Sequence, residues 1–357
     1  MRRLLVLFSL VLGVQGCTRS GDTAPVASAE DLVAGPGTAV APPPSGSQTG
    51  AAVAFDGTNY LVVWADARGT TGSDVYAARL GPTGALLGSA PIVVSAAAGD
   101  QSLPDVAFDG ANYLVVWQDQ RLGGDKNVHA ARVSKAGVVL DPASIAIAQH
   151  GHQVNPAVAW DGTSFLVVWE DQRESSSDIR GARVTPAGGV LEAGLEITDD
   201  APGNQVQPAV GCAAGTCLVA WRDGRNGGPD VYGARVTAAG GVLDPLGLPV
   251  SRASSSQGAP AVAGDGTRFL VAWSDTRNGT SDVYGARVGA DGQLLDPSGR
   301  SIASAPGAQQ AAAVAFEGAY LLVVWEDGRS GTGYDVYGAR VRPTAEVVDP
   351  GGFLVEP

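Results

Sequence analysis

The sequence predicts an all-β protein, a six-bladed β-propeller built from four-stranded antiparallel blades. Three observations lead to this prediction: a tryptophan that recurs at a fixed interval, a hairpin signal in each repeat, and connections too short for a helix. A fixed period of about 50 residues indicates a repeat architecture. The recurring tryptophans, spaced 53, 52, 52, 52 and 52 residues apart, are Trp64, Trp117, Trp169, Trp221, Trp273 and Trp325.

Each repeat begins with a glutamine sixteen residues before its tryptophan, so the repeats start near 48, 101, 153, 205, 257 and 309. Two apolar runs follow. In repeats such as 156–169 they are joined by an Asp-Gly step, where glycine allows the positive φ that a hairpin turn needs. A third strand such as 282–288 and a fourth such as 293–297 complete the repeat. Because these connections leave no room for a crossover helix, each repeat is expected to be an antiparallel meander.

The second run of each repeat, such as Leu166–Trp169, is apolar at every position, which is typical of a strand covered on both faces. Sheets that cover one another in this way form a propeller. A linear β-solenoid is the alternative, but its repeats are usually shorter. The outer strand of the sixth blade could come from residues 38–41 or 352–355. We favour 352–355, because that segment has larger apolar side chains and closes a shorter loop.

The first residues have the pattern of an export signal. Arg2 and Arg3 precede an apolar run of eleven residues, Leu4–Val14, which is too short to span a bilayer and typical of a signal peptide. Gly16 and Cys17 then resemble the lipobox of bacterial lipoproteins, and this resemblance implies cleavage before Cys17 and a lipid on that residue. A plain secretory signal with an incidental cysteine is the alternative.

These features divide the chain into three parts. Residues 1–16 are expected to be the signal peptide, 17–47 a disordered tether rich in Gly, Pro, Ala and Ser, and 48–357 the propeller. We expect an exported protein, anchored by lipid to the bacterial cell envelope on the periplasmic side of the outer membrane or at the surface. The formal net charge of -13 argues against an electrostatic surface for nucleic acid.

Two further cysteines occupy one repeat. Cys212 and Cys217 take positions held elsewhere by aromatic pairs such as Phe55 and Tyr60, on either side of a four-residue hairpin loop. Opposed strand positions lie within disulfide range, and an exported protein meets an oxidising environment. We therefore predict a Cys212–Cys217 disulfide, with two buried thiols as the alternative.

The repeats resemble those of two families. The Asp-Gly turn, apolar run, Arg and Asp-Val-Tyr layout is similar to TolB-type periplasmic propellers, and Val-Val-Trp-x-Asp-x-Arg followed by Asp-Val-Tyr resembles the neuraminidase-type repeats of sialidase-like proteins. The resemblance covers residues 48–357 and implies a propeller. Segments such as 236–243 lack the Ser, Asp and Trp of the sialidase Asp box, so the resemblance does not imply sialidase activity.

Polar residues that occur in every repeat are expected to be structural, because a residue found in all six blades most simply serves the packing of each blade against its neighbour. The Asp-x-Arg pairs are expected to neutralise one another in the seams between blades, and each opening glutamine to bridge backbone groups where one blade passes to the next. The third-strand arginines are Arg79, Arg132, Arg183, Arg235, Arg287 and Arg340. The pairs are Asp66/Arg68, Asp119/Arg121, Asp171/Arg173, Asp223/Arg225, Asp275/Arg277 and Asp327/Arg329.

Candidate binding residues are sought where the repeat varies. The residue between Trp and Asp varies among the repeats and includes Glu170, Arg222 and Glu326, on the face that carries the longer loops. Glu170 and Glu326 lie three blades apart. His150 and His152 precede one opening glutamine, but a His-x-His without a third ligand is a weak metal signal, so solvated loop histidines are expected. His129 takes the position of a tyrosine in the third strand of other repeats and is expected to be a packing substitution.

The sequence therefore indicates a non-catalytic binding or scaffold module, a monomer that contacts an envelope protein or glycan through its loop face. It touches the membrane only through the lipid on Cys17. No catalytic residue, cofactor or metal is predicted. The alternative is a degenerate sialidase-like glycan hydrolase or lyase. An enzyme should cluster unique acids and an Arg or Tyr in one sector of the loop face, and the variable residues are scattered along the sequence instead.

Overall fold

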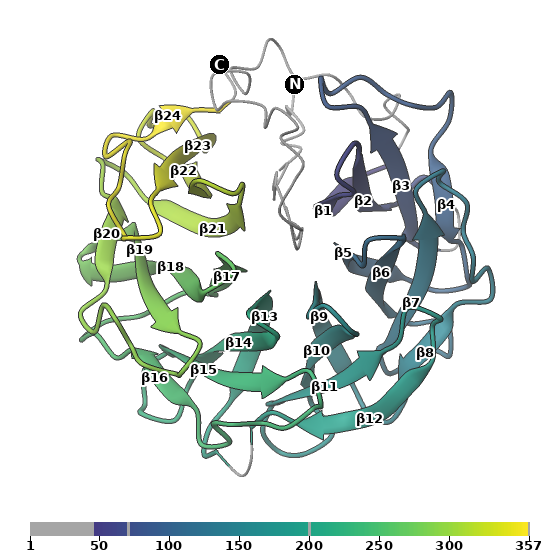
Figure 1. Ribbon diagram of the computed structural model, residues 1–357, viewed down its shortest axis with the longest axis horizontal. Coiled ribbons are helices and arrows are strands. Elements are labelled where there is room, and N and C mark those ends of the chain that lie inside the picture. Colours follow the sequence, from purple (N-terminus) through teal and green to yellow (C-terminus); the bar gives the residue numbers. More distant parts are fainter. Residues whose placement is uncertain (1–45, 70–71, 199–200, 356–357) are drawn as a thin grey trace.

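The computed structural model describes residues 46–69, 72–198 and 201–355, which form six four-stranded antiparallel sheets arranged in a ring (Figure 1). Every sheet has the order of a simple meander, with the first strand nearest the axis and the fourth at the rim. No helix occurs among the described residues, so none of them forms a helix able to cross a membrane. The predicted six-bladed propeller is confirmed.

The strands follow the sequence repeat. Blades 1 to 3 comprise β1 (Gln48–Phe55), β2 (Tyr60–Asp66), β3 (Asp74–Leu80) and β4 (Ile92–Ser95); β5 (Gln101–Phe108), β6 (Asn112–Asp119), β7 (Asn127–Ser134) and β8 (Ile145–Ala148); β9 (Gln153–Trp160), β10 (Phe165–Asp171), β11 (Asp178–Val184) and β12 (Val190–Glu196). Blades 4 to 6 comprise β13 (Gln205–Ala213), β14 (Thr216–Asp223), β15 (Asp230–Thr237) and β16 (Leu248–Ser251); β17 (Ala261–Gly264), β18 (Arg268–Asn278), β19 (Thr280–Gly289) and β20 (Arg300–Ala303); β21 (Gln309–Phe316), β22 (Leu321–Asp327), β23 (Asp335–Val341) and β24 (Phe353–Leu354).

The core consists of layers between neighbouring blades. Leu61 and Val63 of β2 pack in one cluster with Phe108 and Trp117 of blade 2, and the next four interfaces along the chain repeat this arrangement. Between blades 6 and 1 the buried residues form two smaller clusters, in one of which Tyr60 packs against Leu322 and Val324. The run Leu166–Trp169 of β10 is therefore apolar at every position because its two faces meet different layers. Each large buried side chain contributes about 1.5–3 kcal/mol by leaving water.

The fourth strand begins later than expected in every blade but the third, where β12 begins at Val190. In blade 5 the predicted segment 293–297 makes only the isolated bridge between Val288 and Leu294, and β20 begins at Arg300. Asp296 is the physical reason: its carboxylate accepts the backbone N–H of Arg287 at 3.1 Å and the guanidinium Nε at 2.7 Å. A side-chain oxygen thus replaces a strand partner over this stretch.

The C-terminal segment supplies the outer strand of the sixth blade, as favoured from the sequence. β24 pairs with β23 through Tyr337–Leu354 and Gly338–Phe353. The competing segment, 38–41, lies outside the described residues, as do the expected signal peptide and Cys17.

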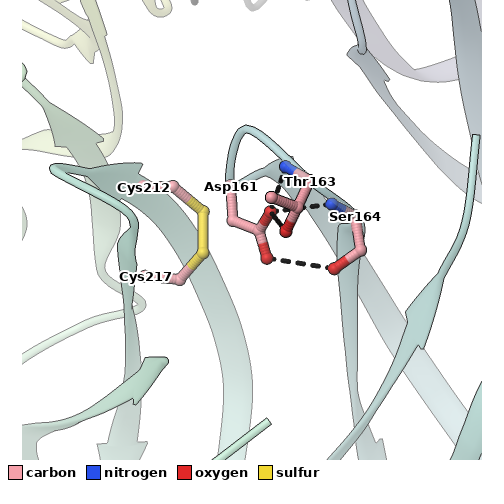
Figure 2. Close-up of a disulfide and its surroundings, with 5 residues drawn as sticks. All are labelled: Asp161, Thr163, Ser164, Cys212 and Cys217. Carbon is pink, nitrogen blue, oxygen red and sulfur yellow. Dashed lines mark hydrogen bonds between the residues drawn. A yellow bond between two sulfur atoms is a disulfide. The ribbon is translucent and has the colours of Figure 1, made fainter. Parts of the chain in front are cut away.

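The predicted disulfide is confirmed. Cys212 and Cys217 are directly opposed residues of β13 and β14, their Cα atoms are 3.9 Å apart, and their sulfurs are bonded. Figure 2 shows the bond beside the hairpin turn of blade 3, where Asp161 accepts the backbone N–H groups of Thr163 and Ser164, each at 2.7 Å. The bond takes the position of the aromatic pairs Phe55–Tyr60 and Phe108–Tyr113, whose ring centroids are 4.7 and 4.9 Å apart.

Replacing both cysteines by alanine is expected to lower the free energy of unfolding by about 2 kcal/mol, since the bond closes only a very short loop in the unfolded chain. Urea denaturation of the double variant and of the unreduced wild type measures this difference. Addition of reductant should destabilise the wild type by a similar amount and leave the variant unchanged. A reductant effect on the variant would contradict the assignment.

Candidate functional site

The first strands of all six blades surround a central channel with a cavity volume of about 460 Å³. This volume lies in the range of small-molecule sites. Most of the wall is Ala, Val, Pro and Gly, because the first strands carry small residues where they approach the axis. A polar side chain in this wall is therefore a departure from the sequence repeat.

A bulge interrupts the first strand of five blades near the loop-face end of the channel. The residue two positions after the opening glutamine has a left-handed backbone, with φ of 50° at Leu103, 52° at Asn155, 55° at Gln207 and 51° at Ala311, and φ of 62° at Gly50. The strand register shifts at the same place. A non-glycine residue in this conformation costs about 1–3 kcal/mol, and such strain is concentrated at functional sites.

Asp105 is the one ionisable side chain among the described residues that line the channel. Its Oδ1 accepts the backbone N–H of Val106 at 2.9 Å, and its Oδ2 accepts that of Val158, in blade 3, at 2.8 Å. Burial raises the pKa of Asp105 to about 6, against the lowering effect of these two N–H groups. A carboxyl group that titrates near neutrality is suited to transfer protons.

Glu170 lies behind the channel wall on β10 and is 4% exposed. Its Oε2 accepts Nδ2 of Asn155 at 2.9 Å and the backbone N–H of Gln207 at 3.2 Å, and its Oε1 accepts Nε2 of Gln172 at 2.5 Å. One carboxylate therefore holds the strained residues of two neighbouring blades. Both of those residues line the channel.

Gln118 repeats this arrangement one blade earlier. It is 4% exposed, its Nε2 donates to Oγ of Ser102 at 2.8 Å, and its Oε1 accepts the backbone N–H of Asn155 at 3.4 Å. Hydrogen bonds thus link Gln118, Asn155, Glu170 and Gln207 across blades 2 to 4, and Asp105 lines the same channel from blade 2. We call these five residues the polar sector.

The candidate residues from the sequence fall in different places. Glu170 belongs to the polar sector, and Arg222 is partly buried on β14 in the equivalent row of blade 4. Glu326 lies on blade 6 and accepts Nε2 of Gln310 at 3.0 Å, away from the sector. His150 is exposed, and Nδ1 of His152 accepts the backbone N–H of Lys126 at 3.2 Å. Among the residues that the structure describes, no group of three metal-ligating side chains is present.

The repeated Trp, Asp and Arg form one motif in every blade. The indole N–H donates to the aspartate carboxylate over 2.8–3.1 Å, and the same carboxylate accepts the arginine backbone and side chain. The carboxylate and the guanidinium neutralise one another, as expected, and the tryptophan beside them packs between blades, as Trp117 does between blades 1 and 2. Arg225 and Arg277 donate to the carbonyls of Leu246 and Ser298 in their own blades, because the polar loop folds back over its own third strand.

Arg121 bonds in the same way in blade 2. Its Nε and Nη2 donate to Asp119 at 2.8 and 2.6 Å, and its Nη1 donates to Oγ of Ser144, a residue of the same blade, at 2.9 Å. The same Oγ lies 3.0 Å from Nδ1 of His129, the residue that replaces a third-strand tyrosine. Burial lowers the pKa of His129, and the positive charge of Arg121 lowers it further. Arg121 therefore serves the interior of its own blade and joins no neighbouring blade through these bonds.

The opening glutamines bind the connections between blades, as the sequence indicated. Nε2 of Gln101 donates to the carbonyl of Gly99 at 2.9 Å, and Nε2 of Gln205 to that of Gly203 at 3.1 Å. These side chains hold the chain where it leaves the rim of one blade and enters the first strand of the next.

Comparison with known proteins gives matches at the level of structure. No protein-family model and no curated protein matches the chain. An α-L-arabinanase from Penicillium chrysogenum, complexed with arabinobiose, is similar with a TM-score of 0.58 and 11% identity, over 86% of this chain and 97% of the arabinanase. A thermostable family-43 glycoside hydrolase (TM-score 0.44, 14% identity, 76% and 100% coverage) and an endo-arabinase from Bacteroides thetaiotaomicron (0.44, 13%, 70% and 95%) are also found.

These findings correct the functional expectation. The comparison runs against the hypothesis of a non-catalytic binding or scaffold module, because the arabinanase of similar fold is a glycan-cleaving enzyme; at 11% identity the similarity shows the fold alone. Asp105, Glu170 and Arg222 lie on three consecutive blades, whereas Glu326 lies on blade 6.

Asp105, Asn155 and Gln207 were missed from the sequence. A signal for Asp105 was present, because the residue four positions after each opening glutamine is alanine in all other repeats: Ala52, Ala157, Ala209, Ala261 and Ala313. The candidates predicted from the sequence lie in the loops and after the tryptophan. Asp105 lies in the first strand, whose place in the channel wall depends on how the blades pack around the axis.

Proposed function

We propose that the protein is a glycan hydrolase that binds its substrate at the loop-face mouth of the central channel and uses Asp105 to transfer protons. The observation that carries this proposal is a single carboxyl group with a pKa of about 6 in an otherwise uncharged wall. The arabinanase of similar fold, solved with arabinobiose, supports a glycan as the substrate class.

In this mechanism the protonated Asp105 donates its proton to the glycosidic oxygen as the bond from that oxygen to the anomeric carbon breaks. Water then adds to the anomeric carbon, and the carboxylate of Asp105 takes up the proton that the water loses. The amides of Asn155 and Gln207 are placed to bind sugar hydroxyls. Glu170 acts as a positioning residue, because its oxygens already accept hydrogen bonds from both of these residues and from Gln172.

The test is release of reducing ends from a panel of oligosaccharides at a mildly acidic pH, below the pKa of Asp105. Arabino-oligosaccharides come first, since the arabinanase of similar fold was solved with arabinobiose. Cleavage by the wild type that is lost in Asp105→Ala supports the proposal. If the folded wild type cleaves none of a panel of neutral and acidic glycans, or if Asp105→Ala cleaves as well as the wild type, the proposal is wrong.

We further propose that the enzyme is a monomer, exported and held at the cell envelope by a lipid on Cys17, so that its substrate is a glycan within reach of the envelope. The Cys17→Ser protein is expected to appear in the soluble fraction, whereas the wild type stays with the membranes. Immunoblots of fractionated cells measure the distribution. Equal partitioning of the two proteins would contradict the anchor.

A further inference from the structure

Five third-strand arginines hold a carboxylate nine residues later in the same blade. In blade 2 the backbone N–H and Nε of Arg132 donate to Oδ2 of Asp141, each at 2.9 Å, and Nη2 donates to Oδ1 at 2.8 Å. Blades 4, 5 and 6 repeat all three bonds, and blade 3 repeats the two side-chain bonds with a glutamate. The pairs are Arg132–Asp141, Arg183–Glu192, Arg235–Asp244, Arg287–Asp296 and Arg340–Asp349.

Blade 1 breaks this pattern. The residue nine positions after Arg79 is Gly88, and no carboxylate among the described residues lies within ion-pair distance of Arg79. The guanidinium keeps the bond that these arginines make to the next blade: Nη1 donates to the carbonyl of Ala136 at 3.5 Å, as Nη1 of Arg132 does to that of Pro186 at 3.2 Å. Neither Nε nor Nη2 of Arg79 donates a hydrogen bond to a residue that the structure describes, whereas in the other blades these two groups bind the carboxylate.

A cavity of about 190 Å³ lies beside Arg79. Its wall includes Arg79, Gly88 and the aliphatic side chains of Leu87, Pro91 and Ile92. It is separate from the central channel, since the two share no lining residue. The cavity combines one guanidinium group with apolar walls, so it suits an anion that also has an aliphatic part.

We propose that Arg79 binds the carboxylate of a small acid, either a free organic acid or a uronic sugar, where Asp or Glu side chains bind the equivalent arginines. The planar guanidinium matches a planar carboxylate through two parallel hydrogen bonds. The repeat itself supplies five examples of this geometry in the same fold. The ligand replaces a side chain that blade 1 lacks.

Gly88→Asp tests this site by restoring the carboxylate from the chain itself. A Cβ at Gly88 would meet only the carbonyl of Ala90, at 3.8 Å, so the substitution fits without rearrangement. Gly228→Asp is the matched control, because it adds the same charge at an exposed glycine with no atom near its Cβ. Arg79→Gln is the second variant, which removes the cation.

The experiment titrates the wild type and the three variants with propionate, galacturonate, galactose and inorganic phosphate, by calorimetry at low salt. Binding of propionate or galacturonate, with no binding of galactose, supports the proposal; a tighter complex with galacturonate than with propionate identifies the uronic sugar as the source. Gly88→Asp and Arg79→Gln should weaken binding at least tenfold, and Gly228→Asp should not change it. Gly88→Asp should also raise the melting temperature, because it forms the missing ion pair.

Three results would overturn the proposal: binding of neither acid, binding that survives Gly88→Asp, or phosphate binding as tight as that of the acids. The outcome is independent of the proposed hydrolase. Asp105→Ala should bind the acids like the wild type, and Gly88→Asp should cleave glycans like the wild type.

Discussion

Asp105→Ala is expected to lower kcat/KM for glycan cleavage by about two to four orders of magnitude, the contribution of a positioned general acid or base. The fold should survive the change, because five of the six blades already carry alanine at this position. Glu346→Gln is the control, since it neutralises an exposed carboxylate on a turn of blade 6. A fall of less than threefold in kcat/KM for Asp105→Ala would exclude Asp105 as the residue that transfers the proton.

The pH profile gives a second readout of the same prediction. Burial raises the pKa of Asp105 to about 6, so its protonated form is abundant below that pH and lost above it. If Asp105 is the acid, kcat/KM should fall as the pH rises through about 6, and any residual activity of Asp105→Ala should lack this step. The same raised pKa affects stability, because folded Asp105 binds its proton more tightly than Asp105 in the unfolded chain. The free energy of unfolding should therefore decrease as the pH rises from about 4 to about 6.

The ring architecture could be predicted because tertiary structure and sequence repeat coincide. Each buried tryptophan, such as Trp169, takes the equivalent position in its own blade, so the number of residues between successive tryptophans equals the length of one blade. The position of the fourth strand could not be predicted. In blade 5 the residues after the third-strand turn do not pair as a strand, because a side-chain oxygen of Asp296 accepts the backbone N–H of Arg287. Strand pairing here therefore depends on a side-chain hydrogen bond.

The polar sector was hidden for a different reason. Glu170 was recognisable as a variation, but its partners come from two blades: Asn155 on its own first strand and Gln207 on the next. The sequence distance from Glu170 to Gln207 is 37 residues, and only ring closure brings their blades face to face. Asn155 and Gln207 also owe their place in the wall to a left-handed bulge, which short-range patterns of apolar residues do not reveal.

Asp275→Ala is expected to lower the free energy of unfolding by about 3–5 kcal/mol, the range for removing one partner of a buried ion pair. The Asp275 carboxylate is fully buried and accepts four hydrogen bonds: from Nε1 of Trp273 at 2.9 Å, and from the backbone N–H, Nε and Nη2 of Arg277 at 2.9, 2.9 and 2.6 Å. Alanine would leave the indole N–H and the guanidinium without this acceptor in a site that excludes water. Asp291→Ala, an exposed turn residue of the same blade, is the control and should change stability by less than about 0.5 kcal/mol.

The pH dependence of the difference in unfolding free energy between the wild type and Asp275→Ala distinguishes the contribution of the ion pair from that of packing. Burial raises the pKa of Asp275, but the hydrogen bonds from Arg277 and Trp273 outweigh it, so the pKa lies below its ordinary value. The stabilisation is therefore complete above the pKa of the unfolded chain, about 3.9, and is lost as the pH falls through the lower folded value. Urea denaturation should give a gap between wild type and Asp275→Ala that is constant from about pH 5 to about pH 8 and narrows below about pH 4. A gap that stays constant down to about pH 3 would mean that alanine destabilises the blade through lost packing, and that the charge on Asp275 contributes nothing.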